Sequence, residues 1–229
     1  MNKTKIEWCD FTWNPIKGLC PVGCWYCYGR KLYLRFGETI MGNYEDEEGG
    51  SDWNIKRPFF ADPGQEKCPK RPSRIFVCST FELFHPVADK WRDDIFLFIE
   101  AHHEHTFIIL TKMPVRIDRP MPDNVWLGVS VTGESMFEIY RAGALGRTEA
   151  RVRFISFEPI LGKPWVISYM SLRANWIIAG RLTGHGKIHD PARSTIEAIV
   201  EYGKANDIPV FLKDNLLEIW GAPLIQELP

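Results

Sequence analysis

The chain has 229 residues, of which 45% are hydrophobic and 25% are charged, and its formal net charge is −1. These values are typical of a folded globular protein, and they exclude a disordered, collagen-like or coiled-coil chain. A near-neutral charge also excludes the global basic field that drives non-specific binding to nucleic acids.

No apolar run approaches the roughly 20 residues that span a bilayer, and the first residues lack the apolar core of a signal peptide. We therefore expect a cytoplasmic protein without a membrane partner. Its six cysteines should be reduced there, which favours a metal or redox role over disulfides.

The predicted elements alternate between strands and helices. A first strand is expected within residues 11–18. Apolar runs typical of buried parallel strands follow at residues 74–79, 106–112, 124–131, 151–157, 175–180 and 208–214. Helical patterns occupy residues 86–105, 135–147 and 190–207. The last pattern opens with Asp190 and Pro191, which predict an N-cap followed by a proline in the first turn.

This alternation predicts the α/β class, as a complete or partial TIM-like (β/α) barrel of about six to seven parallel strands. A Rossmann sheet fits less well because no G-x-G-x-x-G follows the first strand. We expect a single barrel domain over residues 1–229. Residues 37–72, rich in glycine, proline and acidic residues, predict an irregular loop insertion after the first helix.

Polar residues follow every predicted strand. Active sites of barrels lie at the carboxyl ends of the strands, so these residues should gather at one face, although ordinary surface loops also begin with polar residues. They include Ser79, Thr80, Glu82, Thr111, Lys112, Ser130, Thr132, Ser156, Glu158, Arg181, Thr183, Lys213 and Asp214.

Three cysteines follow the first predicted strand in the segment "GLCPVGCWYCYGRK". Cys20, Cys24 and Cys27 have the spacing C-x3-C-x2-C, and Tyr26 precedes the last thiol. Cysteine thiolates are the usual ligands of a [4Fe–4S] cluster, and three of them leave one iron open to an external ligand. The alternatives are a zinc site completed by Cys9 or a histidine, and cysteines that are only structural.

This motif resembles the signature of the radical S-adenosylmethionine (radical SAM) superfamily. Further segments, "FTWNPIKGLC", "VCSTFELFHP", "ILTKMPVR", "NVWLGVSV", "RVRFISFEPILG", "NWIIAG" and "IPVFLKD", resemble a family of small phage- and prokaryote-associated radical-SAM-like proteins and, less closely, spore photoproduct lyase. The resemblance implies an enzyme, of lyase or transferase type, that reductively cleaves S-adenosylmethionine (SAM). The resulting 5′-deoxyadenosyl radical would abstract hydrogen from an unidentified substrate, with a nucleic acid or nucleotide as one candidate.

The resemblance also implies roles for single residues. Cys20, Cys24 and Cys27 would hold the cluster and form the catalytic centre, with Tyr26 beside it. The Gly-Gly-Glu that receives the SAM amino group in the superfamily is replaced here by "STFE". Its hydroxyl and carboxylate groups, on Ser79, Thr80 and Glu82, can accept hydrogen bonds from an ammonium group.

Three residues further along the chain complete the implied cofactor site. Lys112 would bind the SAM carboxylate and Ser130 the ribose. Glu158 would bind the ribose or the substrate, with a barrel-end salt bridge as the alternative role. The resemblance further implies an electron donor such as flavodoxin or ferredoxin. A non-catalytic zinc- or cluster-binding module is the alternative function.

Other polar or cysteine residues are expected to be structural. Cys9, Cys68 and Cys78 are solitary, although Cys68 has a second metal or a redox role as its alternative. The "HHEH" at residues 102–105 is interpreted as a solvated helix end. Arg181, where the related family has a glycine-rich turn, would contact an anionic substrate or cap a loop.

Overall fold

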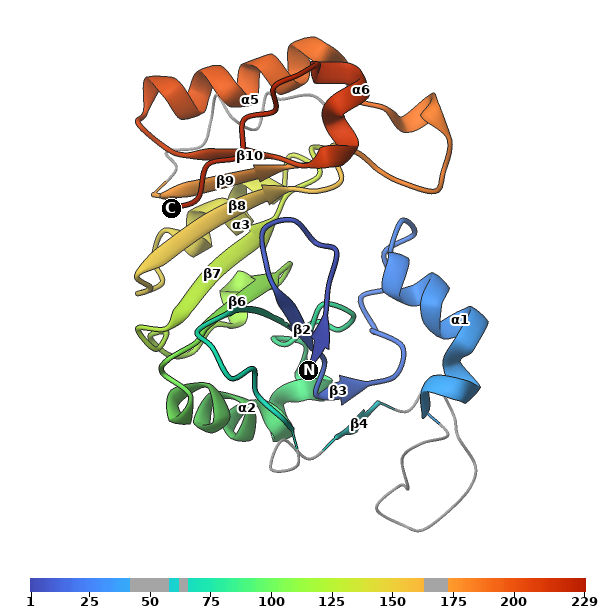
Figure 1. The fold of residues 1–229 in the computed structure, drawn as a ribbon, viewed down its shortest axis with the longest axis vertical. Helices are drawn as coiled ribbons and strands as arrows, with labels where there is room; N and C mark the ends of the chain where they lie inside the picture. The colour runs from blue at the N-terminus through green and yellow to red at the C-terminus, as the bar shows by residue number, and fades with distance from the viewer. Residues whose placement is uncertain (42–57, 62–65, 163–172) are drawn as a thin grey trace. The chain divides into compact units, whose positions relative to one another are not determined.

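The computed structural model describes residues 1–41, 58–61, 66–162 and 173–229. They form a mixed α/β structure with a mostly parallel eight-stranded sheet in the order β1-β2-β5-β6-β7-β8-β9-β10 (Figure 1). No pairing between β1 and β10 closes this sheet in the described part of the chain. The α/β class is confirmed, and the sheet is compatible with a partial barrel.

The strands are β1 (Asn2–Lys3), β2 (Phe11–Trp13), β3 (Ile16–Lys17), β4 (Phe59–Phe60), β5 (Arg74–Val77), β6 (Thr106–Thr111), β7 (Val125–Ser130), β8 (Val152–Phe157), β9 (Trp176–Ala179) and β10 (Val210–Leu212). The α-helices are α1 (Tyr28–Met41), α2 (Asp89–Ala101), α3 (Glu138–Leu145), α5 (Arg193–Ala205) and α6 (Leu217–Trp220). Short 3-10 turns are η2 (Pro86–Ala88), η3 (Pro114–Arg116), η4 (Lys187–His189) and η5 (Asp214–Leu216). Each predicted strand segment contains at least one of these strands, and residues 11–18 contain two, β2 and β3.

The chain divides into two compact units. Unit 1 comprises Met1–Lys5 and Cys9–Ile109, and unit 2 comprises Ile6–Trp8 and Leu110–Pro229. The expectation of a single barrel domain over the whole chain stays a prediction.

Unit 1 is built on parallel pairing around β5. Trp13 of β2 lies opposite Val77, and Ile75 lies opposite Phe107 of β6. The Trp13 ring lies 4.5 Å from the ring of Phe98 in α2, measured between centroids. Burial of these large apolar side chains fixes the strand that leads into the turn at residues 78–82.

Unit 2 contains the parallel strands β7 to β10. Ile155 of β8 lies opposite Ile177 of β9, and every residue of β9 is buried, as expected of a strand covered on both faces. Helix α5 packs against β9 (Figure 1) and buries Ile196, Ile199 and Val200, which recur at helical spacing on one face.

The predicted cap at Asp190 is wrong. Helix α5 begins at Arg193 with Ala192 as its N-cap residue, and no side chain caps it. The Asp190 carboxylate instead accepts a hydrogen bond from Arg181 at 3.0 Å. An ion pair with a distant residue has replaced the local capping bond that the sequence predicts.

The "HHEH" segment at residues 102–105 is not solvated at every position. Helix α2 ends at Ala101, and Nδ1 of His102 donates a hydrogen bond to the carbonyl of Phe98 at 2.8 Å. His105, however, is only 2% exposed and packs edge-on against Phe107. The expectation of a solvated helix end is therefore wrong for His105.

The expected insertion at residues 37–72 contains regular structure where it is described. Helix α1 continues to Met41, and β4 pairs antiparallel with β3. The remainder of the insertion, at residues 42–57 and 62–65, lies outside the described residues. Across the described helices, none is long and apolar enough to cross a membrane.

Candidate functional site

The three clustered cysteines lie on the loop between β3 and α1 in unit 1. Gly23, with a φ of +69°, makes the turn between Cys20 and Cys24. Cys27 directly precedes α1, and its Sγ accepts a hydrogen bond from the backbone N–H of Arg30 at 3.4 Å. All three thiols are free and partly exposed. The loop therefore presents three potential thiolate ligands within one short segment.

Cys20 is the most protected of the three. Burial raises the pKa of its thiol to about 11, and the negative charges of Glu82 and Cys27 act in the same direction. Backbone N–H groups of Val22 and Glu82 donate to its sulfur and partly offset this rise in pKa. Hydrogen bonds to cysteine sulfur are also one way in which proteins tune iron–sulfur clusters.

The turn that follows β5 lies against the cysteine loop. Tyr28 donates a hydrogen bond from its hydroxyl to the carbonyl of Ser79 at 2.9 Å. A β-carbon added at Gly29, which is buried, would lie 3.2 Å from the Cα of Thr80. Together with the hydrogen bond between Glu82 and Cys20, these contacts bring the predicted cysteines and the "STFE" segment together.

Asn14 organises this turn, although the sequence analysis missed it. Its Oδ1 accepts hydrogen bonds from the hydroxyl of Ser79 at 3.1 Å and from the backbone N–H of Thr80 at 3.2 Å. Glu82 is 5% exposed, and its carboxylate accepts a hydrogen bond from the N–H of Phe84. The only available signal for Asn14 was its position directly before Pro15, within the segment of the first predicted strand.

Thr80 has a buried hydroxyl with no hydrogen-bond partner within the described residues. Buried hydroxyls normally have a partner, because desolvation without one costs about 1–3 kcal/mol. The Cα, Cβ and Cγ2 atoms of Thr80 pack against Gly29, in the first turn of the helix that follows Cys27. The orphaned Oγ1 therefore indicates a place for a ligand that donates or accepts a hydrogen bond.

The side chains of the cysteine loop are not gathered into a metal-binding arrangement. No group of three or more histidine, cysteine, aspartate or glutamate side chains that could hold a metal ion is present over the described ranges. The chemistry of the donor set nevertheless fits a thiolate-bound metal, because three free cysteines and an orphaned hydroxyl share one end of unit 1.

The other predicted cofactor residues lie in unit 2. Lys112 donates a hydrogen bond from Nζ to the hydroxyl of Ser130 at 3.4 Å. Ser130 lies opposite Ser156 in the sheet, and both serines are buried. The Ser156 hydroxyl has no hydrogen-bond partner among the residues that the structure describes. The structure thus brings Lys112 and Ser130 together.

Glu158 follows β8 and forms the salt bridge that the sequence analysis gave as its alternative role. Its Oε1 accepts a hydrogen bond from Lys213, which follows β10. Lys213 also lies 3.8 Å from Oε2 of Glu7. No sequence pattern indicated Glu7, because the segment Ile6–Trp8 joins unit 2 only through tertiary contacts.

The sequence matches a protein family over residues 3–222, and the description of that family is "Protein of unknown function (DUF5131)". The chain belongs to the DUF5131 family. No curated protein and no solved structure matches it.

Arg181 of this DUF5131 protein is held by acidic neighbours. Its guanidinium donates to Asp190 and forms an ion pair with Glu218 at 3.1 Å, and the backbone N–H donates to Asn215. These contacts favour the loop-capping role over contact with an anionic substrate.

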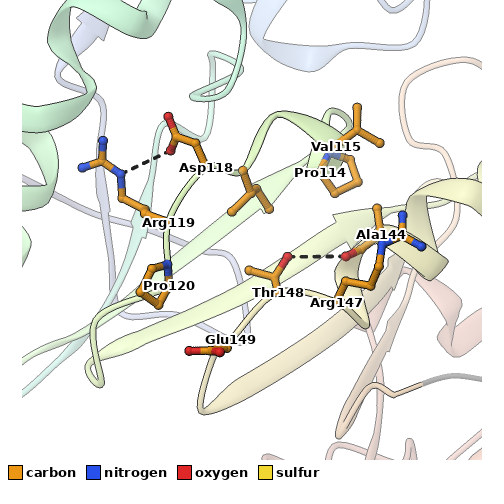
Figure 2. A pocket seen from close by; sticks show the side chains of 10 residues that line it. Pro114, Val115, Asp118, Arg119, Pro120, Ala144, Arg147, Thr148 and Glu149 are labelled. Carbon is orange, nitrogen blue, oxygen red and sulfur yellow. Dashed lines mark hydrogen bonds and ion pairs between the residues drawn. The ribbon is translucent and has the colours of Figure 1, made fainter.

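A pocket of about 400 Å³ lies elsewhere in unit 2, between η3 and α3 (Figure 2). Its walls include an ion pair between Asp118 and Arg119, together with Arg147 and Glu149. Positive and negative side chains are balanced there, and no predicted site residue of the DUF5131 chain lines the pocket. The pocket is therefore separate from the candidate cofactor residues.

Proposed function

We propose that this protein is a radical SAM enzyme built on a partial β/α barrel, with Cys20, Cys24 and Cys27 as the ligands of a [4Fe–4S] cluster. The observation that carries the proposal is the contact between the cysteine loop and the turn that bears the orphaned hydroxyl of Thr80. A loop with three free thiols beside an unsatisfied hydrogen-bonding group suits a cluster with one external ligand.

When bound, the cluster supplies the electron that cleaves the sulfonium of SAM and yields a 5′-deoxyadenosyl radical. The protein residues bind and orient the reactants. Thr80 accepts a hydrogen bond from the ammonium group of SAM, while Asn14 fixes the turn that carries it. The backbone N–H groups that donate to the sulfur of Cys20 partly offset the rise in its pKa that burial causes.

The resemblance assigns the SAM carboxylate to Lys112 and the ribose to Ser130, which lie together in unit 2, and it assigns Glu158 to the ribose or the substrate. Tyr26 lies next to the thiol of Cys27 in sequence and stacks edge-on against Trp25. The substrate that loses hydrogen is a further ligand, with a nucleic acid or nucleotide as a candidate. Flavodoxin or ferredoxin is the expected class of electron donor, and the cytoplasm is the expected compartment.

The test begins with protein purified without oxygen. We expect brown protein with about four irons per chain, and dithionite with SAM should yield 5′-deoxyadenosine. Colourless protein that contains zinc would overturn the proposal and favour a non-catalytic metal-binding module.

The ligand assignment is tested by Cys24→Ala. This variant should lose SAM cleavage and cluster absorbance while it keeps the thermal unfolding midpoint of the metal-free chain, because Cys24 is a partly exposed loop residue. Cys68→Ala is the matched control, since Cys68 is also free and partly exposed but lies outside the loop. Cleavage by the Cys24→Ala variant would contradict the assignment.

A further inference from the structure

The carboxylate of Glu158 is held at one oxygen and open at the other. Oε1 accepts a hydrogen bond from Nζ of Lys213. Within the described part of the chain Oε2 forms no hydrogen bond or ion pair, and the side chain is 25% exposed. The ion pair with Lys213 orients the carboxylate of Glu158 and leaves Oε2 as a hydrogen-bond acceptor. Such a carboxylate suits a ligand that donates a hydrogen bond.

Lys213 is largely buried and has a second acidic neighbour. Its side chain is only 13% exposed, and the carboxylate of Glu7 lies 3.8 Å from Nζ. The other oxygen of Glu7 accepts a hydrogen bond from the backbone N–H of Asp214 at 3.0 Å, so Glu7 itself is anchored. One cation therefore lies between two carboxylates, of which that of Glu7 is held by a backbone N–H.

Gly180 provides the space for this arrangement. A β-carbon at that position would lie 2.9 Å from Cδ of Lys213 and 3.5 Å from Cδ of Glu158. Any larger residue would push the lysine side chain away from its partner. The glycine after β9 thus permits the contact between residues that follow β8 and β10.

We propose that Lys213 is a positioning residue that holds Oε1 of Glu158, so that Oε2 accepts a hydrogen bond from a ribose hydroxyl of the bound nucleoside ligand. This inference rests on the proposed function, in which that ligand is SAM. A hydrogen bond to an ionised, pre-oriented acceptor is stronger than one to a neutral or mobile acceptor. Lys213 also separates the charges of Glu158 and Glu7, which would otherwise repel each other in a partly buried site.

The experiment compares two ligands on the full chain prepared without oxygen. The ligands are S-adenosylhomocysteine and its 2′,3′-dideoxy analogue, and the dissociation constant of each is measured by calorimetry. The wild type should bind the ribose form about tenfold more tightly or better. Lys213→Met and Glu158→Gln should each reduce this preference to about threefold or less.

Lys213→Arg should keep most of the preference, because a guanidinium also donates to both carboxylates. Lys187→Met is the matched control, since the Lys187 side chain is 81% exposed and forms an ion pair with Glu218. The control should show the wild-type preference. A purely structural role for Lys213 would lower the affinity for both ligands equally. The ratio of the two dissociation constants therefore distinguishes a structural role from a role in positioning Glu158.

A Lys213→Met variant that remains folded and keeps the wild-type preference would overturn the inference. If that variant does not fold, Gly180→Ala tests the same point by displacing the lysine chain without removing its charge. Retention of the full preference by folded Gly180→Ala would then overturn it. Wild-type protein that binds neither ligand would instead overturn the proposed function itself, so the two failures are distinguishable.

Discussion

Phe154 in β8 covers the backbone of Gly128 in β7. The two residues are register partners, and a β-carbon at Gly128 would lie 2.3 Å from atoms of the Phe154 ring. Phe154 is fully buried, and its ring centroid lies 5.3 Å from that of Trp176. The ring therefore fills the space that any side chain at residue 128 would need.

Gly128→Ala should lower the free energy of unfolding by about 1–3 kcal/mol, because a fully buried ring must shift to admit the methyl group. Urea denaturation measures the change. Gly143→Ala in α3 is the control, since no atom lies within 4 Å of a β-carbon there. That variant should instead raise the free energy of unfolding by about 0.5–1 kcal/mol through helix propensity. Equal effects of both substitutions would contradict the packing seen between β7 and β8.

Glu138→Ala should destabilise the loop after β7 by about 2–4 kcal/mol. The buried Glu138 carboxylate accepts hydrogen bonds from the N–H groups of Thr132 at 2.9 Å and Gly133 at 2.7 Å. Its removal leaves these donors without partners. Glu134→Ala, at an exposed position of the same loop, should change stability by less than about 0.5 kcal/mol in the same denaturation experiment. A similarly small effect of Glu138→Ala would show that the carboxylate does not hold this loop.

Thr80→Val should affect SAM binding without destabilising unit 1. Valine has the shape of threonine but lacks the orphaned hydroxyl, so the thermal unfolding midpoint should stay the same or rise. If Thr80 binds the SAM ammonium group, the dissociation constant for SAM should increase about tenfold while the iron content is unchanged. Unchanged SAM affinity would remove Thr80 from the binding site. Thr148→Val, at a partly exposed position in unit 2, is the matched control.

Alkylation of Cys20 should depend steeply on pH in the metal-free protein. Since burial raises the pKa of this thiol to about 11, the reactive thiolate is a minor species at pH 7. The rate with iodoacetamide should rise about tenfold for each pH unit from pH 7 to pH 10. Peptide mass spectrometry follows the modification, with N-acetylcysteine as a control whose rate levels off above about pH 8.5. A plateau at Cys20 below pH 9 would contradict the burial of its thiol.

The strands were largely predictable because their signal is local. Runs such as residues 74–77 and 176–179 are apolar at nearly every position, as strands covered on both faces must be. Helix ends were less predictable, because Asp190 can bond either to the backbone or to a distant cation. Arg181 supplies that cation after the chain folds.

The sequence by itself determined the strand pattern and the three-cysteine loop, since both depend on residues that are neighbours in the chain. Only the tertiary structure decided that Thr80 has a buried hydroxyl without a described partner, and that Glu7 anchors its carboxylate on Asp214, 207 positions away. Such contacts depend on how the strands pair and on where the first residues pack. These contacts form only when segments that are distant in the chain pack against each other and exclude water. No local periodicity or residue spacing therefore predicts them.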